Sequence, residues 1–214
     1  MTIDRRNLFT GGAGLFGALA LTAVAGDMTL AEAAENHPHL DPHQSTLLPH
    51  LLPNLSTVTT TIDPVMPRDL DAHERKLLAT FDELDFVVYS GQHWNRFSES
   101  HAPDVRVHNP DGTFTDGLQA HIEALKFQFL WAPDTRVVQH PIKIVNGNLT
   151  AVVGIGKGTF TQPMPLPDGS AIPPTGKPFQ MSMTTVARWN HRNLIKEEFL
   201  FLDLQSIQQQ IGLA

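Results

Sequence analysis

Four long segments with β-strand patterning occupy the second half of the chain, and they constrain its fold more than any other feature. They span about residues 138–144, 149–160, 177–189 and 194–202. Turn signals such as Asn146-Gly147 separate them, so consecutive strands are expected to pair as an antiparallel meander. The segments with helical periodicity all come earlier. This order predicts an α+β domain, with helices on the concave face of a curved antiparallel sheet and an apolar, cone-shaped pocket between them.

The helical segments are recognised by their caps and apolar spacing. Asp71 and Glu74 have the spacing of a capping box, and apolar residues then recur at helical spacing at Leu77, Phe81, Leu84 and Val88. A second, short helix is expected to carry His93, Trp94 and Phe97.

A central helix is predicted over Gly117–Leu130. Asp116 is its expected N-cap, and its apolar stripe consists of Leu118, Ile122, Leu125 and Phe129. We expect this helix on the concave side of the sheet. A parallel strand pair or a second domain would contradict this architecture.

Two features of the strands leave alternatives open. His140 alternates with Val138, Ile142 and Ile144, so it is either a hydrogen-bonded core residue or a pocket residue. Gly154, Gly156 and Gly158 share one face of the next strand. Either a bulge bends that strand, or another group packs closely on the glycines.

The N-terminus has the character of an export signal. Arg5 and Arg6 precede an uncharged, Gly- and Ala-rich run that ends near Ala25, in a small-x-small cleavage site. The paired arginines favour the twin-arginine route. Residues 1–25 are therefore predicted to be a signal peptide, and the mature protein is expected in the periplasm or outside the cell, without stable membrane association.

Residues 26–69 are predicted to form a Pro- and His-rich linker or arm, followed by one domain over residues 70–214. Six prolines between Pro38 and Pro67 disfavour regular elements. His37, His39, His43 and His50 could bind a metal loosely, although a solvated segment is the simpler interpretation. The β-prone stretch from Thr57 to Ile62 could add an edge strand.

Charge and composition exclude several classes of function. The formal net charge is −7 and no basic stripe occurs, which argues against nucleic-acid binding. The absence of cysteine excludes disulfides, thiolate metal sites and a cysteine nucleophile. No Gly-x-Ser-x-Gly elbow supports serine hydrolysis. A metal site from His93, His101 and His108 is conceivable, but no compact ligand motif occurs.

From about Leu77 to Ala214 the chain resembles the SnoaL-like polyketide cyclase family, also called ester cyclases, of the NTF2-like superfamily. The resemblance lies in segments that follow in the expected order: Asp104 to Gly112, Ala120 to Ile122, Pro133 to Thr135, His140 to Ile142, Gly158 to Phe160, Pro173 to Lys177, and Glu197 to Leu213. It implies an NTF2-like cone and a cofactor-free aldol-type cyclase that works by acid–base chemistry.

The candidate catalytic residues are His108, His121, Glu198 and Asp203. His108 ends a short strand that contains Val105 and Val107, and His121 borders the apolar stripe of the central helix, so the two could converge on the cavity. Glu198 alternates with Leu200 and Leu202 and faces either the cavity or solvent. Asp203 is either a catalytic partner or the cap of a final helix ending near Ile211. Each histidine has a structural alternative as a packing or hydrogen-bonding residue.

We expect Trp94, Phe129, Trp131 and His140 to line the substrate-binding wall, and we expect no metal and no cofactor. The function predicted is an exported acid–base cyclase, isomerase or hydrolase that acts on a small apolar carbonyl or ester compound. The alternative is a non-catalytic module that binds a hydrophobic ligand or assembles with a partner. Two or more ionisable groups inside one cavity would favour the enzyme. An NTF2-like sheet leaves one face free of its own helices, so a homodimer or higher even oligomer is expected.

Overall fold

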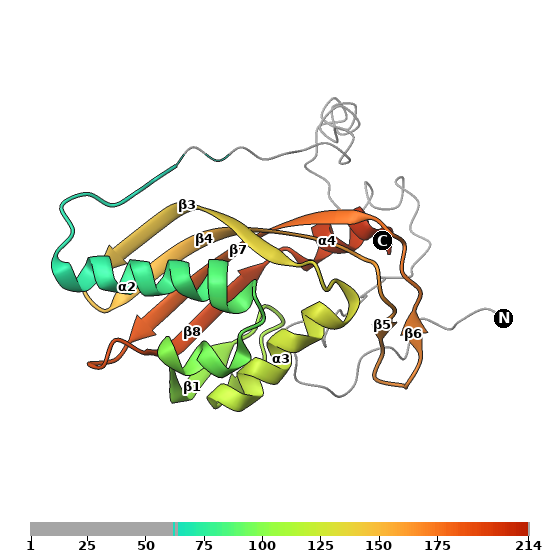
Figure 1. The fold of residues 1–214 in the computed structure, drawn as a ribbon, viewed down its shortest axis with the longest axis horizontal. Helices are drawn as coiled ribbons and strands as arrows, with labels where there is room; N and C mark the ends of the chain where they lie inside the picture. The colour runs from blue at the N-terminus through green and yellow to red at the C-terminus, as the bar shows by residue number, and fades with distance from the viewer. Residues whose placement is uncertain (1–61, 63, 214) are drawn as a thin grey trace, which may run out of the picture. The chain divides into compact units, whose positions relative to one another are not determined.

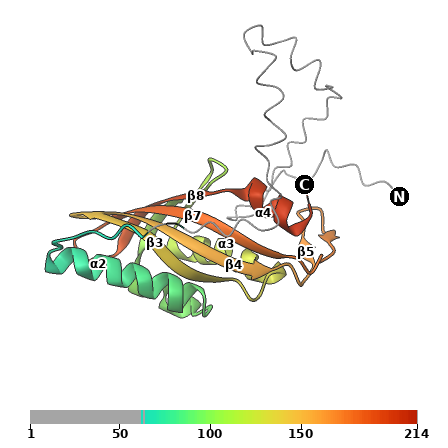
Figure 2. The ribbon, with the colours of Figure 1, turned by 90° about the horizontal axis from the view of Figure 1, so that it is seen from above.

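The computed structural model describes residue 62 and residues 64–213. The predicted signal peptide, residues 1–25, and most of the predicted arm, residues 26–69, lie outside the described residues. The domain is α+β, as predicted (Figures 1 and 2). Its described helices before the long strands are α2 (Ala72–Glu83), the π-helix η4 (Leu84–Tyr89), the 3₁₀-helix η5 (Trp94–Glu99) and α3 (Leu118–Trp131).

One six-stranded sheet forms the other layer, in the order β2-β1-β8-β7-β4-β3. Its strands are β1 (His101–His108), β2 (Phe114–Asp116), β3 (Arg136–Asn146), β4 (Leu149–Thr159), β7 (Pro178–Trp189) and β8 (Ile195–Leu202). The four long strands β3, β4, β7 and β8 pair antiparallel in chain order, which confirms the meander. The expectation that no strands pair in parallel is wrong, because β1 pairs in parallel with β8.

The Pro-rich loop between β4 and β7 contains a small ribbon that was not expected from the sequence. It consists of β5 (Met164–Pro165) and β6 (Ala171–Ile172), paired antiparallel. After β8 the chain ends in α4 (Leu204–Ile211). Ile207 and Ile211 of α4 form a hydrophobic cluster with Trp131 and Phe179, among other residues, at one end of the domain.

The larger core fills the space between the helices and the sheet. Residues of α2, η4, η5 and α3 form one buried cluster with Val105, Val107, Val152, Trp189 and other sheet residues. The predicted capping box of α2 is present, since the side chain of Asp71 accepts from Glu74 N and Glu74 reaches back to Asp71 N. Helix α2 continues into η4, whose wider turn is closed by a hydrogen bond from Ser90 N to Asp85 O at 3.3 Å.

The central helix is confirmed, but its predicted cap is not. Gly117 is the N-cap, without a side-chain hydrogen bond. Asp116 instead forms two hydrogen bonds of 2.7 Å with Arg106 across the β1–β2 pair. The stripe packs as predicted, with Ile122, Leu125 and Phe129 buried and Leu118 partly buried against the same core.

Strand β3 does not keep the alternation expected from its sequence. The register against β4 shifts between Val137 and Gln139 and again between Gln139 and Ile142. Val137 and His140 are consequently buried, while Val138 and Ile144 are exposed. The irregular register thus brings His140 into the interior.

The glycine face of β4 has a close-packed neighbour, which decides between the two alternatives for this strand. A Cβ on Gly154 would lie 2.8 Å from Met183 Cε, and one on Gly158 would lie 2.6 Å from Phe179 Cζ. Gly156 faces Met181 in the same way. The glycines therefore make room for large side chains of β7 on the inner face of the sheet.

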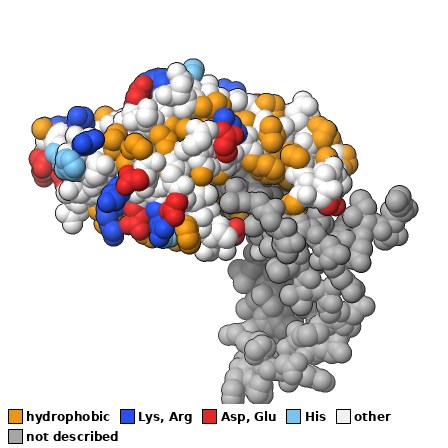
Figure 3. All heavy atoms as spheres, turned by 90° about the horizontal axis from the view of Figure 1, so that it is seen from below, with side chains coloured by type: hydrophobic (Ala, Val, Ile, Leu, Met, Phe, Trp, Pro, Cys, Tyr) orange, Lys and Arg blue, Asp and Glu red, His pale blue; other side chains and the backbone are white. Residues whose placement is uncertain are grey.

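The segment before α2 also contacts the sheet. Val65 forms an isolated parallel bridge with Ile142 of β3, through hydrogen bonds to Pro141 O and from Lys143 N. None of the described helices is long and apolar enough to cross a membrane. In Figure 3, charged side chains gather toward the end of the domain where α2 begins, and hydrophobic ones toward the end with β5 and β6.

Candidate active site

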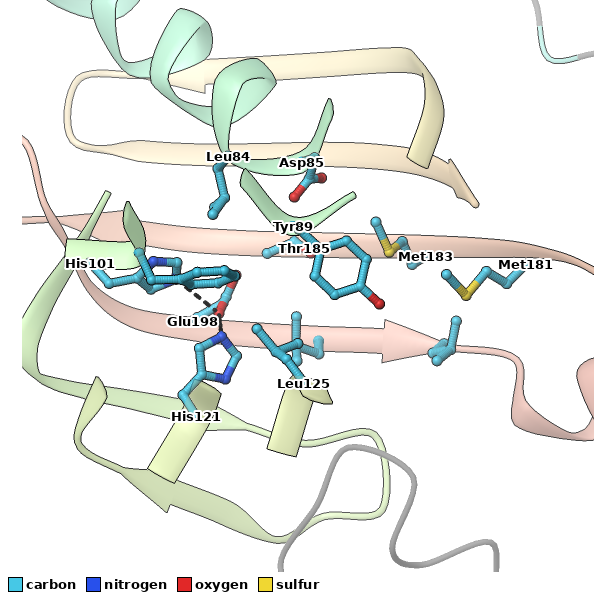
Figure 4. Close-up of a pocket in the computed structure, with 13 residues that line it drawn as sticks. Leu84, Asp85, Tyr89, His101, His121, Leu125, Met181, Met183, Thr185 and Glu198 are labelled. Carbon is cyan, nitrogen blue, oxygen red and sulfur yellow. Dashed lines mark ion pairs between the residues drawn. The ribbon is translucent and has the colours of Figure 1, made fainter. Parts of the chain in front are cut away.

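A cavity of about 60 Å³ lies between the helices and the inner face of the sheet (Figure 4). Its wall consists of Leu84, Asp85, Tyr89, Phe97, His101, His121, Leu125, Met181, Met183, Thr185, Glu198, Leu200 and Leu202. Most of these side chains are apolar. A volume of this size holds a few water molecules, and the two flexible methionines are the side chains best able to move aside for a larger ligand.

Three ionisable side chains from distant parts of the chain meet on one side of this cavity. His101 begins β1, His121 lies in the first turns of α3, and Glu198 is on β8. Glu198 Oε2 is 3.6 Å from His101 Nε2 and 3.5 Å from His121 Nε2. All three side chains are almost completely buried. The other nitrogen of His101, Nδ1, lies 2.9 Å from Ser100 Oγ, which holds the ring in place.

The charges of this cluster are set by burial and by its own members. Burial raises the pKa of Glu198, but the nearby imidazoles of His101 and His121 outweigh it, so the pKa lies below its ordinary value. Burial lowers the pKa of His121 to about 4, against the attraction of Glu198. Glu198 is therefore a carboxylate at neutral pH, and His121 is a neutral imidazole.

A second polar group lies on the other side of the cavity. Asp85, on η4, accepts a hydrogen bond of 2.9 Å at Oδ2 from His140 Nε2. His140 Nδ1 lies 2.7 Å from Asp82 Oδ1, and both oxygens of Asp82 bind Lys143 Nζ at 2.6 and 2.8 Å. The buried ring of His140 thus links a cavity carboxyl to a partly exposed ion pair.

Burial changes the proton affinity of the residues on η4. It raises the pKa of Asp85 above its ordinary value, although the hydrogen bond and charge of His140 act in the opposite direction. Burial and the nearby charge of Asp85 likewise raise the pKa of Tyr89. Tyr89 therefore keeps its proton, and Asp85 binds a proton more tightly than an exposed aspartate does.

One set of side chains here has the composition of a metal site. His101, His121 and Glu198 each offer one ligand atom, and these atoms lie within 4.8 Å of one another. Two imidazoles and one carboxylate form a common donor set for zinc and for non-haem iron.

The comparison with known proteins places the chain in a family. The family model described as SnoaL-like polyketide cyclase matches residues 81–211, which is more than half of the chain. The chain belongs to the SnoaL-like polyketide cyclase family. No protein of curated function matches this SnoaL-like chain.

Solved structures agree with the NTF2-like, or ketosteroid isomerase-like, fold. A protein from Jannaschia with the same family description has 20% identity and a TM-score of 0.59, over 69% of this chain and 99% of its own. IdmH from Streptomyces antibioticus has 23% identity and a TM-score of 0.54, over 64% and 99%. A protein of ketosteroid isomerase-like fold from Catenulispora acidiphila has 14% identity and a TM-score of 0.51, over 65% and 94%.

Two of the four predicted catalytic residues of this SnoaL-like protein lie in the cavity wall, namely His121 and Glu198. His108 does not point into the cone. Val107 faces the core, so His108 lies on the opposite face of the sheet, stacked on Phe199 with ring centroids 4.3 Å apart. Its Nε2 lies 3.1 Å from Glu197 Oε1.

Asp203, also predicted to be catalytic, lies outside the cavity wall as well. It is exposed and caps α4, where its side chain accepts a hydrogen bond from Ser206 N at 2.9 Å. The cap was the structural alternative for this residue, and it agrees with the described contacts.

None of the four residues predicted for the substrate-binding wall lines the cavity directly. Trp94 stacks on Phe97 and contacts Phe129. Phe129 supports the wall from behind, through an edge contact with Tyr89 at 5.1 Å. Trp131 packs in the α4 cluster. His140 is a buried, hydrogen-bonded core histidine, which was one of its two alternatives, and it holds the cavity residue Asp85.

Sequence reasoning missed Asp85 and Tyr89, and it named His101 only as a conceivable metal ligand together with His93 and His108. Asp85 lies four residues after Phe81 and four before Tyr89, so a carboxyl between two aromatic rings on one helix face was the available signal. His101 has the same parity as the buried valines Val105 and Val107. An even spacing within a strand places residues on the same face, which indicated an inward-facing histidine.

Proposed function

We propose that this SnoaL-like protein is an acid–base enzyme that moves a proton next to the carbonyl group of a small apolar carbonyl or ester compound, as an aldol-type cyclase, isomerase or hydrolase does. The observation that carries the proposal is the arrangement of the cavity. A buried carboxyl on η4 lies across one apolar pocket from a buried cluster of two imidazoles and a carboxylate. This chemistry needs no organic cofactor.

Asp85 is the proton acceptor in this scheme. At 12%, its side chain is more exposed than those of His101, His121 and Glu198, so a bound compound can reach it. Burial moves its pKa toward neutrality, where a general base works best. His140 holds one carboxyl oxygen through a 2.9 Å hydrogen bond and so fixes the orientation of the base.

The reaction step follows from this geometry. The carboxylate of Asp85 takes the proton from the carbon next to the carbonyl group, and the electrons of the C–H bond form an enolate with negative charge on oxygen. Tyr89 points its hydroxyl into the cavity (Figure 4) and keeps its proton, so it can donate a hydrogen bond to that oxygen. The side chains of His101, His121 and Glu198 lie in the same cavity wall.

The composition of the pocket supports an enzyme rather than a simple binding module. A cone that only holds a hydrophobic ligand needs no buried charges, since each is unfavourable to bury without a partner. Here two carboxyls and two imidazoles line one cavity, those of Asp85, Glu198, His101 and His121. This supports the enzyme, and the leucines and methionines of the wall support an apolar substrate.

Hydrogen–deuterium exchange can test the proposal without knowledge of the natural substrate. The full chain is incubated in D₂O with apolar 1,3-diketones and β-keto esters, and deuterium incorporation at the central carbon is followed by mass spectrometry. Asp85→Asn is expected to reduce the catalysed exchange by roughly 10²- to 10⁴-fold, the usual contribution of general acid–base catalysis. Asp104→Asn, an exposed aspartate on β1, is the control and should exchange like the wild type.

Two results would count against the proposal. Equal exchange rates for Asp85→Asn and the wild type would remove Asp85 as the base. Tight binding of apolar carbonyl compounds without catalysed exchange of any of them would favour the non-catalytic module.

We also propose that the enzyme works in the periplasm or outside the cell and forms an even oligomer. The export proposal is supported by Arg5, Arg6 and the following uncharged run. The oligomer is supported by large apolar side chains that are exposed on the sheet, among them Ile144 at 54% and Phe201 at 58%.

A further inference from the structure

The cluster beside the cavity contains polar atoms that lack hydrogen-bond partners among the described residues. His101 Nε2 and Glu198 Oε2 are both buried in this way. They lie 3.6 Å apart, and His121 Nε2 is 3.5 Å from the same oxygen. A charge-assisted N–H···O hydrogen bond is normally about 2.7–2.9 Å long, so these contacts are too long for good hydrogen bonds. Buried polar atoms without partners are unfavourable, so a group bound between them would stabilise the cluster.

The separations fit a metal ion better than a proton. Zn–N and Zn–O bonds of about 2.0–2.2 Å at tetrahedral angles place two ligand atoms roughly 3.3–3.5 Å apart. The two distances to Glu198 Oε2 agree with this within about 0.3 Å. One atom from each of the three residues lies within 4.8 Å of the others.

The surroundings of His101 resemble those of a metal-binding histidine. A metal-bound imidazole usually donates its second N–H to an oxygen that fixes the ring. His101 Nδ1 lies 2.9 Å from Ser100 Oγ, and Ser100 Oγ lies 3.2 Å from Phe97 O. If Ser100 donates to Phe97 O, Nδ1 carries the proton and donates to Ser100. The lone pair of His101 Nε2 then faces the carboxylate of Glu198.

We propose that His101, His121 and Glu198 bind one divalent metal ion of the first transition series, of the zinc, cobalt or iron(II) type. Two neutral imidazoles and one carboxylate carry a net charge of −1, which a divalent ion converts to +1. Three protein ligands leave a coordination position open, as in catalytic rather than structural zinc sites. That position is available to a ligand in the adjoining cavity, whose wall contains all three residues.

The ion's chemical role rests on the proposed function, but its binding does not. A metal in the cluster would polarise the carbonyl oxygen and stabilise the enolate that forms when Asp85 removes the proton. The site would therefore select compounds in which an oxygen donor lies close to the acidic carbon, such as β-dicarbonyl compounds.

Metal binding can be measured directly on the full chain, produced without a histidine tag. The four histidines His37, His39, His43 and His50 are first replaced by glutamine, because they could bind metal by themselves. After incubation with Zn²⁺ and dialysis, elemental analysis is expected to find one ion per chain. Loading with Co²⁺ should give the intense visible absorption of a four- or five-coordinate site, and this readout requires no change to the cluster.

Variants of the cluster locate the ion. Loss of a residue that only hydrogen-bonds to a metal ligand typically weakens metal binding by roughly 10- to 100-fold. His101→Gln and Glu198→Gln remove a ligand itself, so each should weaken Zn²⁺ binding by more than this. Ser100→Ala should weaken it within that smaller range. His108→Gln is the matched control, since His108 also lies beside a glutamate, Glu197, but on the other face of the sheet, and it should bind Zn²⁺ normally.

The possible results separate this proposal from the proposed function. No bound ion and no Co²⁺ spectrum in the chain with the altered tract would overturn the metal site, whether or not deuterium exchange occurs. Binding that persists in both His101→Gln and Glu198→Gln would overturn it as well. A bound ion without catalysed exchange would keep the site and remove the acid–base function. Asp85→Asn should keep the ion and lose the exchange.

Discussion

Replacement of His140 by phenylalanine tests the polar network behind the cavity. The imidazole lies between Asp85 and Asp82, with contacts of 2.9 and 2.7 Å. Its ring also packs against Phe81 and Phe86, at centroid distances of 5.9 and 4.3 Å. Phenylalanine has a similar size and shape, so His140→Phe should keep these ring contacts and remove only the two polar ones.

The expected loss of stability follows from what each carboxyl retains. Asp82 keeps both contacts with Lys143 and is one-third exposed, so its loss should be small. Asp85 is 9% exposed and loses the hydrogen bond from His140. Removing one partner of a buried ion pair typically destabilises a protein by about 3–5 kcal/mol, and we expect His140→Phe to fall in this range at pH 6–7.

The pH dependence of this loss has a definite sign. The hydrogen bond and charge of His140 lower the pKa of Asp85, while burial raises it, so the pKa should rise further in the variant. A group whose folded pKa lies above its unfolded value destabilises the fold as pH rises through that interval. For Asp85 the interval starts near its ordinary value of 3.8. Burial lowers the pKa of His140, but Asp85 and Asp82 raise it above its ordinary value of 6.5, so the stabilisation by the charged ring is complete below 6.5 and is lost as pH rises through the folded value. The deficit should therefore be larger at pH 6 than at pH 4.

Urea unfolding followed by circular dichroism measures these differences. The double variant His140→Phe/Asp85→Leu is the key comparison, because replacing both partners of a buried pair by apolar groups is often neutral or stabilising. It should recover most of the stability lost in His140→Phe. A loss below about 1 kcal/mol for the single variant, or a double variant less stable than the single one, would show that the network does not stabilise Asp85 as described.

Three further predictions concern the cavity wall, export and assembly. Gly154→Ala should push the flexible Met183 side chain into the cavity and lower deuterium exchange, with little loss of melting temperature. Gly158→Ala should lower the melting temperature clearly, because the new methyl group meets the ring of Phe179 and Thr135 Oγ1. A larger loss of melting temperature in Gly154→Ala than in Gly158→Ala would contradict this packing. Replacement of Arg5 and Arg6 by lysine should abolish export of a reporter fused to residues 1–35 through the twin-arginine system, and unchanged export would refute that route. Light scattering at micromolar concentration should find an even oligomer that Phe201→Glu weakens, and a monomeric wild type would refute the assembly.

Local patterns were sufficient for most of the secondary structure. The capping box at Asp71, the stripe of α3 and the Asn146-Gly147 turn each act within one or two turns of chain, and each has the predicted outcome. The irregular features were not predictable in this way. The π-turn of η4 and each register shift of β3 insert one residue, so the residues that follow point to a different face than regular periodicity predicts. No residue type in the sequence marks these insertions. The alternation around His140 therefore gave the wrong faces for Val138 and Ile144.

The site depended on contacts that no local pattern encodes. Glu198 and His121 were identified because each lies on the apolar face of its own element, which is a local property. The link to His101 requires β1 to pair in parallel with β8, between segments that are about 90 residues apart in the sequence. A meander predicts pairing only between consecutive strands, so it predicts no neighbour for β1 and no contact between His101 and Glu198. Once β1 lies beside β8, alternation puts Val107 and Glu198 on the inner face and His108 and Glu197 on the outer face. The same pairing brings His101 to Glu198, so the proposed metal site exists only because the first and last strands of the domain meet.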